Sequence, residues 1–172
     1  MRAFIAIDVP LNNEIKTAIA SLRNIDTSLK IVDDSMSHIT LAFLGEISES
    51  QKDEILNLLS QINNNVCFKA ELKSLEAISP QFLRVIAVKI NSELLEKTRT
   101  ELVAKLNKIK IKADSHPAHL TLARTRNQSK KKELMQYIND NKQKFFEEFT
   151  VNKLILKKST LTPERPIYKD LN

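Results

Sequence analysis

Residues 37–42 read SHITLA and residues 118–123 read AHLTLA, so one pattern of small, His, apolar, Thr, Leu and Ala occurs twice. Side chains alternate between the two faces of an extended strand. In the first copy His38 and Thr40 would therefore share one face. The apolar residues that separate and follow them, Phe43 included, would share the other. The first copy predicts a strand with one polar and one apolar face.

The second copy follows the same alternation, with His119 and Thr121 opposite Leu120 and Leu122. The apolar face of each strand can pack on a core, which leaves a histidine and a hydroxyl roughly 7 Å apart on the other face. Two such strands side by side would line one polar cleft with two imidazoles. The repeat therefore predicts a central site as well as two strands.

The rest of the chain alternates strand and helix patterns. Apolar alternation favours strands near 2–8, 38–43, 67–75, 82–90, 119–123 and 149–158 and a short one near 167. Helical spacing favours helices near 12–22, 49–61 and 129–142, and a long helix capped by Ser92. Three phenylalanines, Phe145, Phe146 and Phe149, are expected to fill the core rather than to stack on bases.

The size and composition fit one globular domain. A chain of 172 residues can bury a sizeable core, and its 42% hydrophobic and 28% charged residues exclude a disordered chain. No Pro- or Ser-rich linker divides it, so residues 1–172 are predicted to form a single domain. The apolar start at residues 4–7 ends at Asp8, far short of the roughly 18 residues that span a bilayer. We expect a cytoplasmic protein without membrane contact.

Several site classes are excluded by residue counts. Gly45 is the only glycine, which excludes a Gly-rich phosphate loop or a dinucleotide fingerprint. Cys67 is the only cysteine, so it cannot form an intrachain disulfide or a thiolate cluster, and we expect it in the core or a strand. His116 and Asp114 are metal-ligand types, but no further ligands follow at a familiar spacing. We therefore predict no cofactor and no metal.

Two imidazoles in one cleft suit phosphodiester chemistry. Opening a cyclic phosphodiester with water needs one group to take a proton from the nucleophile and another to protonate the departing oxygen. Histidine, with an ordinary pKa of about 6.5, can do both near neutral pH. The net charge of +6 and pI ≈ 9.4 favour a polyanionic partner such as RNA.

The phosphate itself needs hydrogen-bond donors and positive charge. The hydroxyls of Thr40 and Thr121 can donate to its oxygens, and a guanidinium can neutralise charge that develops there. Arg124 and Arg126 follow the second motif. Regular alternation from His119 favours Arg126 on the same face, whereas Arg124 would need a bulge or a strand end.

At these residues the chain resembles the 2H (two-histidine) phosphoesterase superfamily, whose mark is a pair of His-x-Thr/Ser motifs in two pseudo-symmetric lobes. It looks most like the branch of RNA 2′,3′-cyclic phosphodiesterases, also called 2′-5′ RNA ligases, in its archaeal form. The likeness covers residues 1–8, 37–46, 117–124 and the ending at 158–168. It departs from the family at residues 30–33, which lack the tryptophan often found before the first motif.

The resemblance implies an α+β, bilobal, pseudo-symmetric fold with two antiparallel sheets that form a central cleft and helices packed outside. It also implies metal-free hydrolysis of RNA 2′,3′-cyclic phosphate ends to 2′-phosphates, and some members join tRNA halves through a 2′-5′ bond. His119 would activate water, His38 would protonate the leaving 3′ oxygen, and Thr40 and Thr121 would bind phosphate.

Several expectations stay open at this point. Phe4 and Tyr168 are candidates for base stacking. The run at residues 130–132 is either a solvated face or part of an RNA path. The partner is expected to be RNA with cyclic phosphate ends, tRNA halves among the candidates, and the chain is expected to be monomeric. The alternatives are a noncatalytic RNA-binding module of the same fold and a phosphodiesterase for small cyclic nucleotides.

Overall fold

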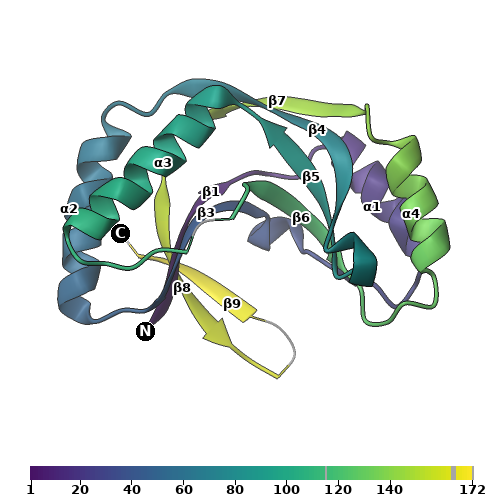
Figure 1. Ribbon diagram of the computed structural model, residues 1–172, viewed down its shortest axis with the longest axis horizontal. Coiled ribbons are helices and arrows are strands. Elements are labelled where there is room, and N and C mark those ends of the chain that lie inside the picture. Colours follow the sequence, from purple (N-terminus) through teal and green to yellow (C-terminus); the bar gives the residue numbers. More distant parts are fainter. Residues whose placement is uncertain (115, 164–165, 172) are drawn as a thin grey trace.

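The computed structural model describes residues 1–114, 116–163 and 166–171 (Figure 1). Its elements follow one another in the order β1 (Arg2–Asp8), α1 (Asn13–Ile25), β2 (Lys30–Ile31), η1 (Asp34–Met36), β3 (His38–Glu46), α2 (Glu49–Asn63), β4 (Phe68–Ile78), η2 (Pro80–Phe82), β5 (Val85–Asn91), α3 (Glu93–Lys108), β6 (His119–Arg124), α4 (Lys131–Asp140), β7 (Phe145–Val151), β8 (Ile155–Leu161) and β9 (Pro166–Leu171). Four α-helices accompany antiparallel strands in the described residues, which confirms the α+β class.

The strands pair antiparallel in the order β7-β4-β5-β6-β3-β1-β8-β9, with β2 beside β6. The centre of this sheet is its weakest junction, because β3 and β6 pair there only through Ile39 opposite Leu120. We call the array β3-β1-β8-β9 the first lobe and the array β6-β5-β4-β7 the second lobe. The two antiparallel sheets expected from the resemblance are thus present, joined in the described residues into one curled sheet.

Each lobe contains a strand from the other half of the chain. β4 follows α2 but pairs with β5 of the second lobe, and β8 pairs with β1 of the first lobe. α1 and α4 lie on the outside of the second lobe, whereas α2 and α3 lie beside the first lobe (Figure 1). The helices therefore cover one face of the curled sheet and leave its concave face open.

The helices α1, α2 and α3 begin where the sequence supplies a capping side chain, whereas α4 has none. Asn12, Ser48 and Ser92 each accept a hydrogen bond from a backbone N–H in the first turn of α1, α2 and α3. The apolar side of each helix packs on the sheet, as Ile15 and Leu22 of α1 do at full burial. No helix among the described residues is both long and apolar enough to cross a bilayer.

Three local predictions are wrong. Phe145, expected in the core, is 52% exposed, whereas its neighbour Phe146 is buried. The single strand expected near 149–158 is two strands, β7 at the edge of the second lobe and β8 in the first. Neither Gly nor Pro marks the break, which falls at Asn152-Lys153, where the apolar residues change from positions 149 and 151 to positions 154 and 156. Cys67 is exposed and precedes β4, because its neighbour Val66 takes the buried position.

Candidate active site

The two His-x-Thr segments lie on the neighbouring central strands β3 and β6. Their polar residues line one cavity of about 710 Å³ on the concave face, to which His38, Thr40, His119 and Thr121 all contribute. The structure thus brings together the four residues of the repeat. The cavity wall is completed by residues of β1, β8 and β9 and of the segments 30–36 and 112–117.

A β-bulge follows the first motif and changes which face the next residue occupies. Two consecutive β1 residues pair with Thr40 and Ala42, so Leu41 has no partner and both Leu41 and Ala42 are buried. Phe43 consequently returns to the cavity face, where its ring is 44% exposed. The prediction that Phe43 points away from His38 is wrong, since it assumed a regular strand.

The same bulge follows the second motif. Two consecutive β5 residues pair with Thr121 and Ala123, which leaves Leu122 unpaired and buried. Arg124 therefore lines the cavity, whereas Arg126 lies beyond the end of β6 and outside the cavity lining. The alternation argument that favoured Arg126 was wrong, and the bulge that Arg124 required is present.

Both imidazoles are held in the same way. Nδ1 of His38 lies 2.7 Å from the carbonyl oxygen of Met36, and Nδ1 of His119 lies 2.9 Å from that of Pro117. A carbonyl can only accept, so each Nδ1 carries the proton and donates it. Nε2 is left as the unprotonated nitrogen of each neutral ring.

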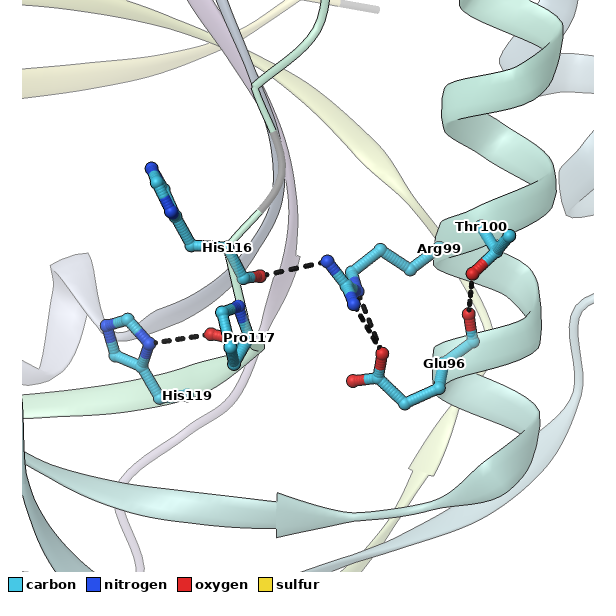
Figure 2. Close-up of polar contacts among 6 residues, drawn as sticks. All are labelled: Glu96, Arg99, Thr100, His116, Pro117 and His119. Atoms are coloured by element: carbon cyan, nitrogen blue, oxygen red, sulfur yellow. Dashed lines mark hydrogen bonds and ion pairs between the residues drawn. The ribbon is translucent and has the colours of Figure 1, made fainter.

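The segment that orients His119 is itself held by α3 (Figure 2). Nη1 of Arg99 donates to the carbonyl oxygen of His116 at 3.0 Å, one residue before Pro117. Nε and Nη2 of the same guanidinium contact one carboxylate oxygen of Glu96, at 3.0 and 2.5 Å. Figure 2 shows these contacts in one line from the helix to the His119 ring.

The first lobe has an equivalent support. Met36 ends the short η1 helix, whose Asp34 accepts a hydrogen bond from the Leu11 backbone N–H at 2.9 Å. Lys16 of α1 forms an ion pair with Asp34, also at 2.9 Å. Each histidine is therefore oriented by a backbone carbonyl. The segment that carries this carbonyl is held in turn by a cation, Lys16 of α1 for His38 and Arg99 of α3 for His119.

Aromatic rings surround His38. The ring centroids of Phe4 and Tyr168 each lie 5.1 Å from that of His38 and 5.0 Å from each other. The Tyr168 ring is edge-on to His38, at an interplanar angle of 89°. Burial lowers the pKa of His38, and the hydrogen bond to the Met36 carbonyl opposes that shift. Burial also raises the pKa of Tyr168, so its phenol stays protonated near neutral pH.

The two stacking candidates differ in accessibility. Phe4 lines the cavity but is only 4% exposed and packs against His38, which disfavours the stacking role expected for it. Tyr168 is half-buried and lines the cavity. Sequence reasoning missed Phe43 and His116, whose rings lie 6.3 Å apart on the cavity wall.

Behind His38 lies a charged cluster that the sequence did not indicate. Lys157 is buried between Asp8 and Asp170, with Nζ–O distances of 2.9 and 2.5 Å. Asp8 is the cross-strand partner of His38. The charge of Lys157 lowers the pKa of His38, and that of Asp8 raises it, both less than burial does. Only the long-range pairing of β1 with β8 creates this cluster.

The other candidates have ordinary structural partners. Asp114 exchanges two backbone hydrogen bonds of 2.8 Å with Phe43, and no group of three His, Cys, Asp or Glu side chains gathers in the described part of the chain. In the lysine run, Lys130 pairs with Glu133 and Lys131 donates to a backbone carbonyl. The run lies at the start of α4, outside the cavity lining.

Comparison with known proteins identifies the family to which the chain is similar. A family model described as the 2′-5′ RNA ligase superfamily matches residues 11–161. An RNA 2′,3′-cyclic phosphodiesterase of Methanocaldococcus jannaschii is 35% identical, with 98% of this chain and 97% of the relative covered. One from Archaeoglobus fulgidus is 32% identical, with 99% and 98% covered.

Solved structures show the same fold. The protein TT0787 of Thermus thermophilus superposes with a TM-score of 0.78 at 23% identity, covering 100% of this chain and 96% of that one. E. coli LigT complexed with 3′-AMP gives a TM-score of 0.71 at 22% identity, with 99% and 95% covered. The chain belongs to the 2′-5′ RNA ligase superfamily of two-histidine phosphoesterases.

Proposed function

We propose that this chain is an RNA 2′,3′-cyclic phosphodiesterase that hydrolyses terminal cyclic phosphate to 2′-phosphate, with His38 and His119 as the acid–base pair. The matched anchoring of the two rings carries the proposal, because each Nδ1 is bonded to a backbone carbonyl and each Nε2 is left for proton transfer. Curated relatives with this activity at 35% and 32% identity support the substrate class.

The roles of the two histidines follow from where the leaving oxygen must be. The 3′ oxygen stays on the ribose after the P–O3′ bond breaks, so the general acid belongs beside the nucleoside. Much of the cavity wall lies on the first lobe, around Phe43 and Tyr168, and the hydrogen bond of His38 is partly buried there. The corresponding bond of His119 is exposed. We therefore assign the acid to His38 and the water-activating base to His119.

The remaining cavity residues would bind the phosphate. The hydroxyls of Thr40 and Thr121 and the guanidinium of Arg124 supply donors on the side where charge develops on the non-bridging oxygens. Water gives a proton to His119 as its oxygen bonds to phosphorus, and His38 gives a proton to O3′. The anionic substrate also favours protonated His38, which offsets the effect of burial on its pKa.

We also propose that the enzyme acts as a monomer, in the cytoplasm, and stacks a base on aromatic rings of the cavity. The cavity is formed within one chain, which supports action as a monomer, and RNA ends such as those of cleaved tRNA would be encountered in the cytoplasm. Phe43, with its half-exposed ring, replaces Phe4 as the proposed stacking partner of a base, together with Tyr168.

The test uses EDTA-treated protein and an RNA oligonucleotide ending in 2′,3′-cyclic phosphate, with chromatographic identification of the product. We expect a 2′-phosphate, and we expect H38A and H119A each to lower kcat by at least about a hundredfold while unfolding like the parent. Undiminished turnover by both variants would sink the mechanism. Binding without product would favour a noncatalytic module, and faster turnover of a cyclic mononucleotide would favour a small substrate.

A further inference from the structure

The active-site cavity extends along the first lobe beyond the two His-x-Thr motifs. Ala6 of β1 lies opposite Thr40, one of the proposed phosphate ligands. Phe4 lies opposite Phe43, and Arg2 is two residues nearer the start of the strand. Residues two apart in a strand share a face, so Arg2 joins Phe4 in the cavity wall. The cavity therefore runs from the proposed phosphate site, past the proposed nucleoside site, to an arginine.

The Arg2 guanidinium has no ionic partner among the described residues. Its side chain is exposed, and no hydrogen bond joins the guanidinium to another residue that the structure describes. Glu46, its cross-strand partner, instead contacts the N-terminal ammonium of Met1, at 3.1 Å. A guanidinium in this state presents all its donors to a ligand, and its planar fork matches the oxygens of a phosphate. Arg2 is therefore suited to bind an anion that enters the cavity.

The charge of Arg2 reaches the proposed nucleoside site. The register of β1 with β8, extended by one residue, sets Arg2 beside Ser159, whose β9 partner is Tyr168. Burial raises the pKa of Tyr168, and the charges of Arg124 and Arg2 oppose that shift. The phenol thus lies within electrostatic reach of two guanidiniums. One of them is the proposed ligand of the cyclic phosphate, and the other lies at the far end of the cavity.

A second cation reaches the same end of the cavity from the other side of β3. The segment before β6 runs antiparallel to β3, with Asp114 paired to Phe43. Lys112 precedes Asp114 by two residues and so lies beside Gly45, and both residues line the cavity. The Lys112 side chain is exposed, and its ammonium has no hydrogen bond or ion pair within the described part of the chain. Arg2 and Lys112 therefore flank the end of β3 as two cations without counterions.

The separation between these cations and the phosphate site fits one nucleoside. Four residues of β1 separate Arg2 from Ala6, the partner of Thr40, which is roughly 13 Å at the usual rise of a strand. The long arginine side chain covers part of that distance, and Phe43 and Tyr168 line the cavity between the two ends. In an RNA that ends in a cyclic phosphate, the next anion is the phosphate on the 5′ side of the terminal nucleoside. The bound chain would carry this phosphate towards the two cations.

We propose that Arg2 and Lys112 bind the phosphodiester on the 5′ side of the terminal nucleoside, and so select RNA chains over cyclic mononucleotides. This inference rests on the proposed function, which places the cyclic phosphate between the two histidines. Arg2 can hold two oxygens of the internal phosphate with its planar fork, whereas Lys112 adds a point charge. Neither side chain takes part in proton transfer, so the pair acts on the choice of substrate.

The experiment compares two dinucleotides that end in 2′,3′-cyclic phosphate, one with an ordinary internal phosphate and one with an uncharged methylphosphonate in its place. In the parent we expect the methylphosphonate to lower kcat/KM roughly tenfold, because it removes the internal charge and keeps both nucleosides. R2M/K112M should hydrolyse both dinucleotides within about twofold of the parent's value on the methylphosphonate. The control K158M removes a charge from the residue opposite Ala3, outside the cavity lining, and should keep the tenfold preference.

The single variants and the folding control make the outcomes distinct. R2M and K112M should each show a preference between those of the parent and the double variant, and all variants should unfold in denaturant like the parent. A parent indifferent to the internal charge, or a double variant that keeps the full preference, would overturn the subsite. Equal losses on both dinucleotides would also overturn it, since the cations would then act on the cyclic phosphate or on the fold. A parent that hydrolyses neither dinucleotide would refute the proposed function itself.

Discussion

His38 and His119 occupy the same position in their motifs, yet their surroundings differ. His38 packs against both Phe4 and Tyr168, and burial is the largest cause of its lowered pKa. The groups that face it come from several strands: Asp8 raises this pKa, while Lys157 and Arg124 lower it. A histidine with a lowered pKa is a stronger acid than an ordinary imidazolium, but it holds its proton only at lower pH.

The pH dependence of the reaction should report this environment. In the free enzyme, kcat/KM should fall as pH rises through the lowered pKa of His38, because the acid loses its proton there. Bound cyclic phosphate is an anion and raises that pKa, so the falling limb of kcat should lie at higher pH than the falling limb of kcat/KM. Steady-state profiles between about pH 5 and 9 measure both limbs. The reverse order of the two limbs would show that His38 is not the acid.

At the scale of elements, the bulges decide which side chains line the cavity. We expect R124M to lower kcat/KM by about a hundredfold, since it removes the guanidinium that lines the cavity, and R124K to recover part of the loss. R126M is the matched control and should stay within about threefold, because Arg126 lies outside the lining. Comparable losses in R124M and R126M would contradict this account of the second bulge.

The helix α3 should also affect catalysis although it contributes no residue to the cavity lining. R99M removes the contact that holds the His116–Pro117 segment, and a small misplacement of an oriented base is costly. We expect kcat to fall roughly tenfold with KM within about twofold, and R99K to recover part of kcat. The neighbouring control K97M should behave like the parent. A change in KM alone would assign Arg99 to substrate binding.

Sequence patterns predicted much of this architecture, and they failed where pairing partners set the geometry. Alternation correctly placed His38 and Thr40 on one face. It assumed a regular strand, however, and so did not predict the bulge at Leu41–Ala42. Two consecutive apolar residues in each motif were the available signal. The break between β7 and β8 is marked only by the polar pair Asn152-Lys153, and the pairing of β8 with a distant strand decides it. Lys157 became part of the site for the same reason.

At the scale of the whole molecule, the exchange of strands brings both ends of the chain together at Lys157. This side chain on β8 contacts Asp8 of β1 and Asp170 of β9, so one ammonium links three strands of the first lobe. Its own side chain is 9% exposed, whereas both carboxylates are nearly half exposed. Water can therefore solvate the carboxylates if the lysine is lost, and the effect should lie at the low end for a buried ion pair.

K157M should lower the free energy of unfolding by about 3 kcal/mol, as measured in denaturant titrations at pH 7. Removing this cation should also raise the pKa of His38, because Lys157 lowers it while Asp8 stays in place. The falling limb of kcat/KM should then move to higher pH. K158M changes an exposed lysine of the same strand and should alter neither property. A destabilised K157M with an unmoved limb would mean that the cluster links the strands but does not tune His38.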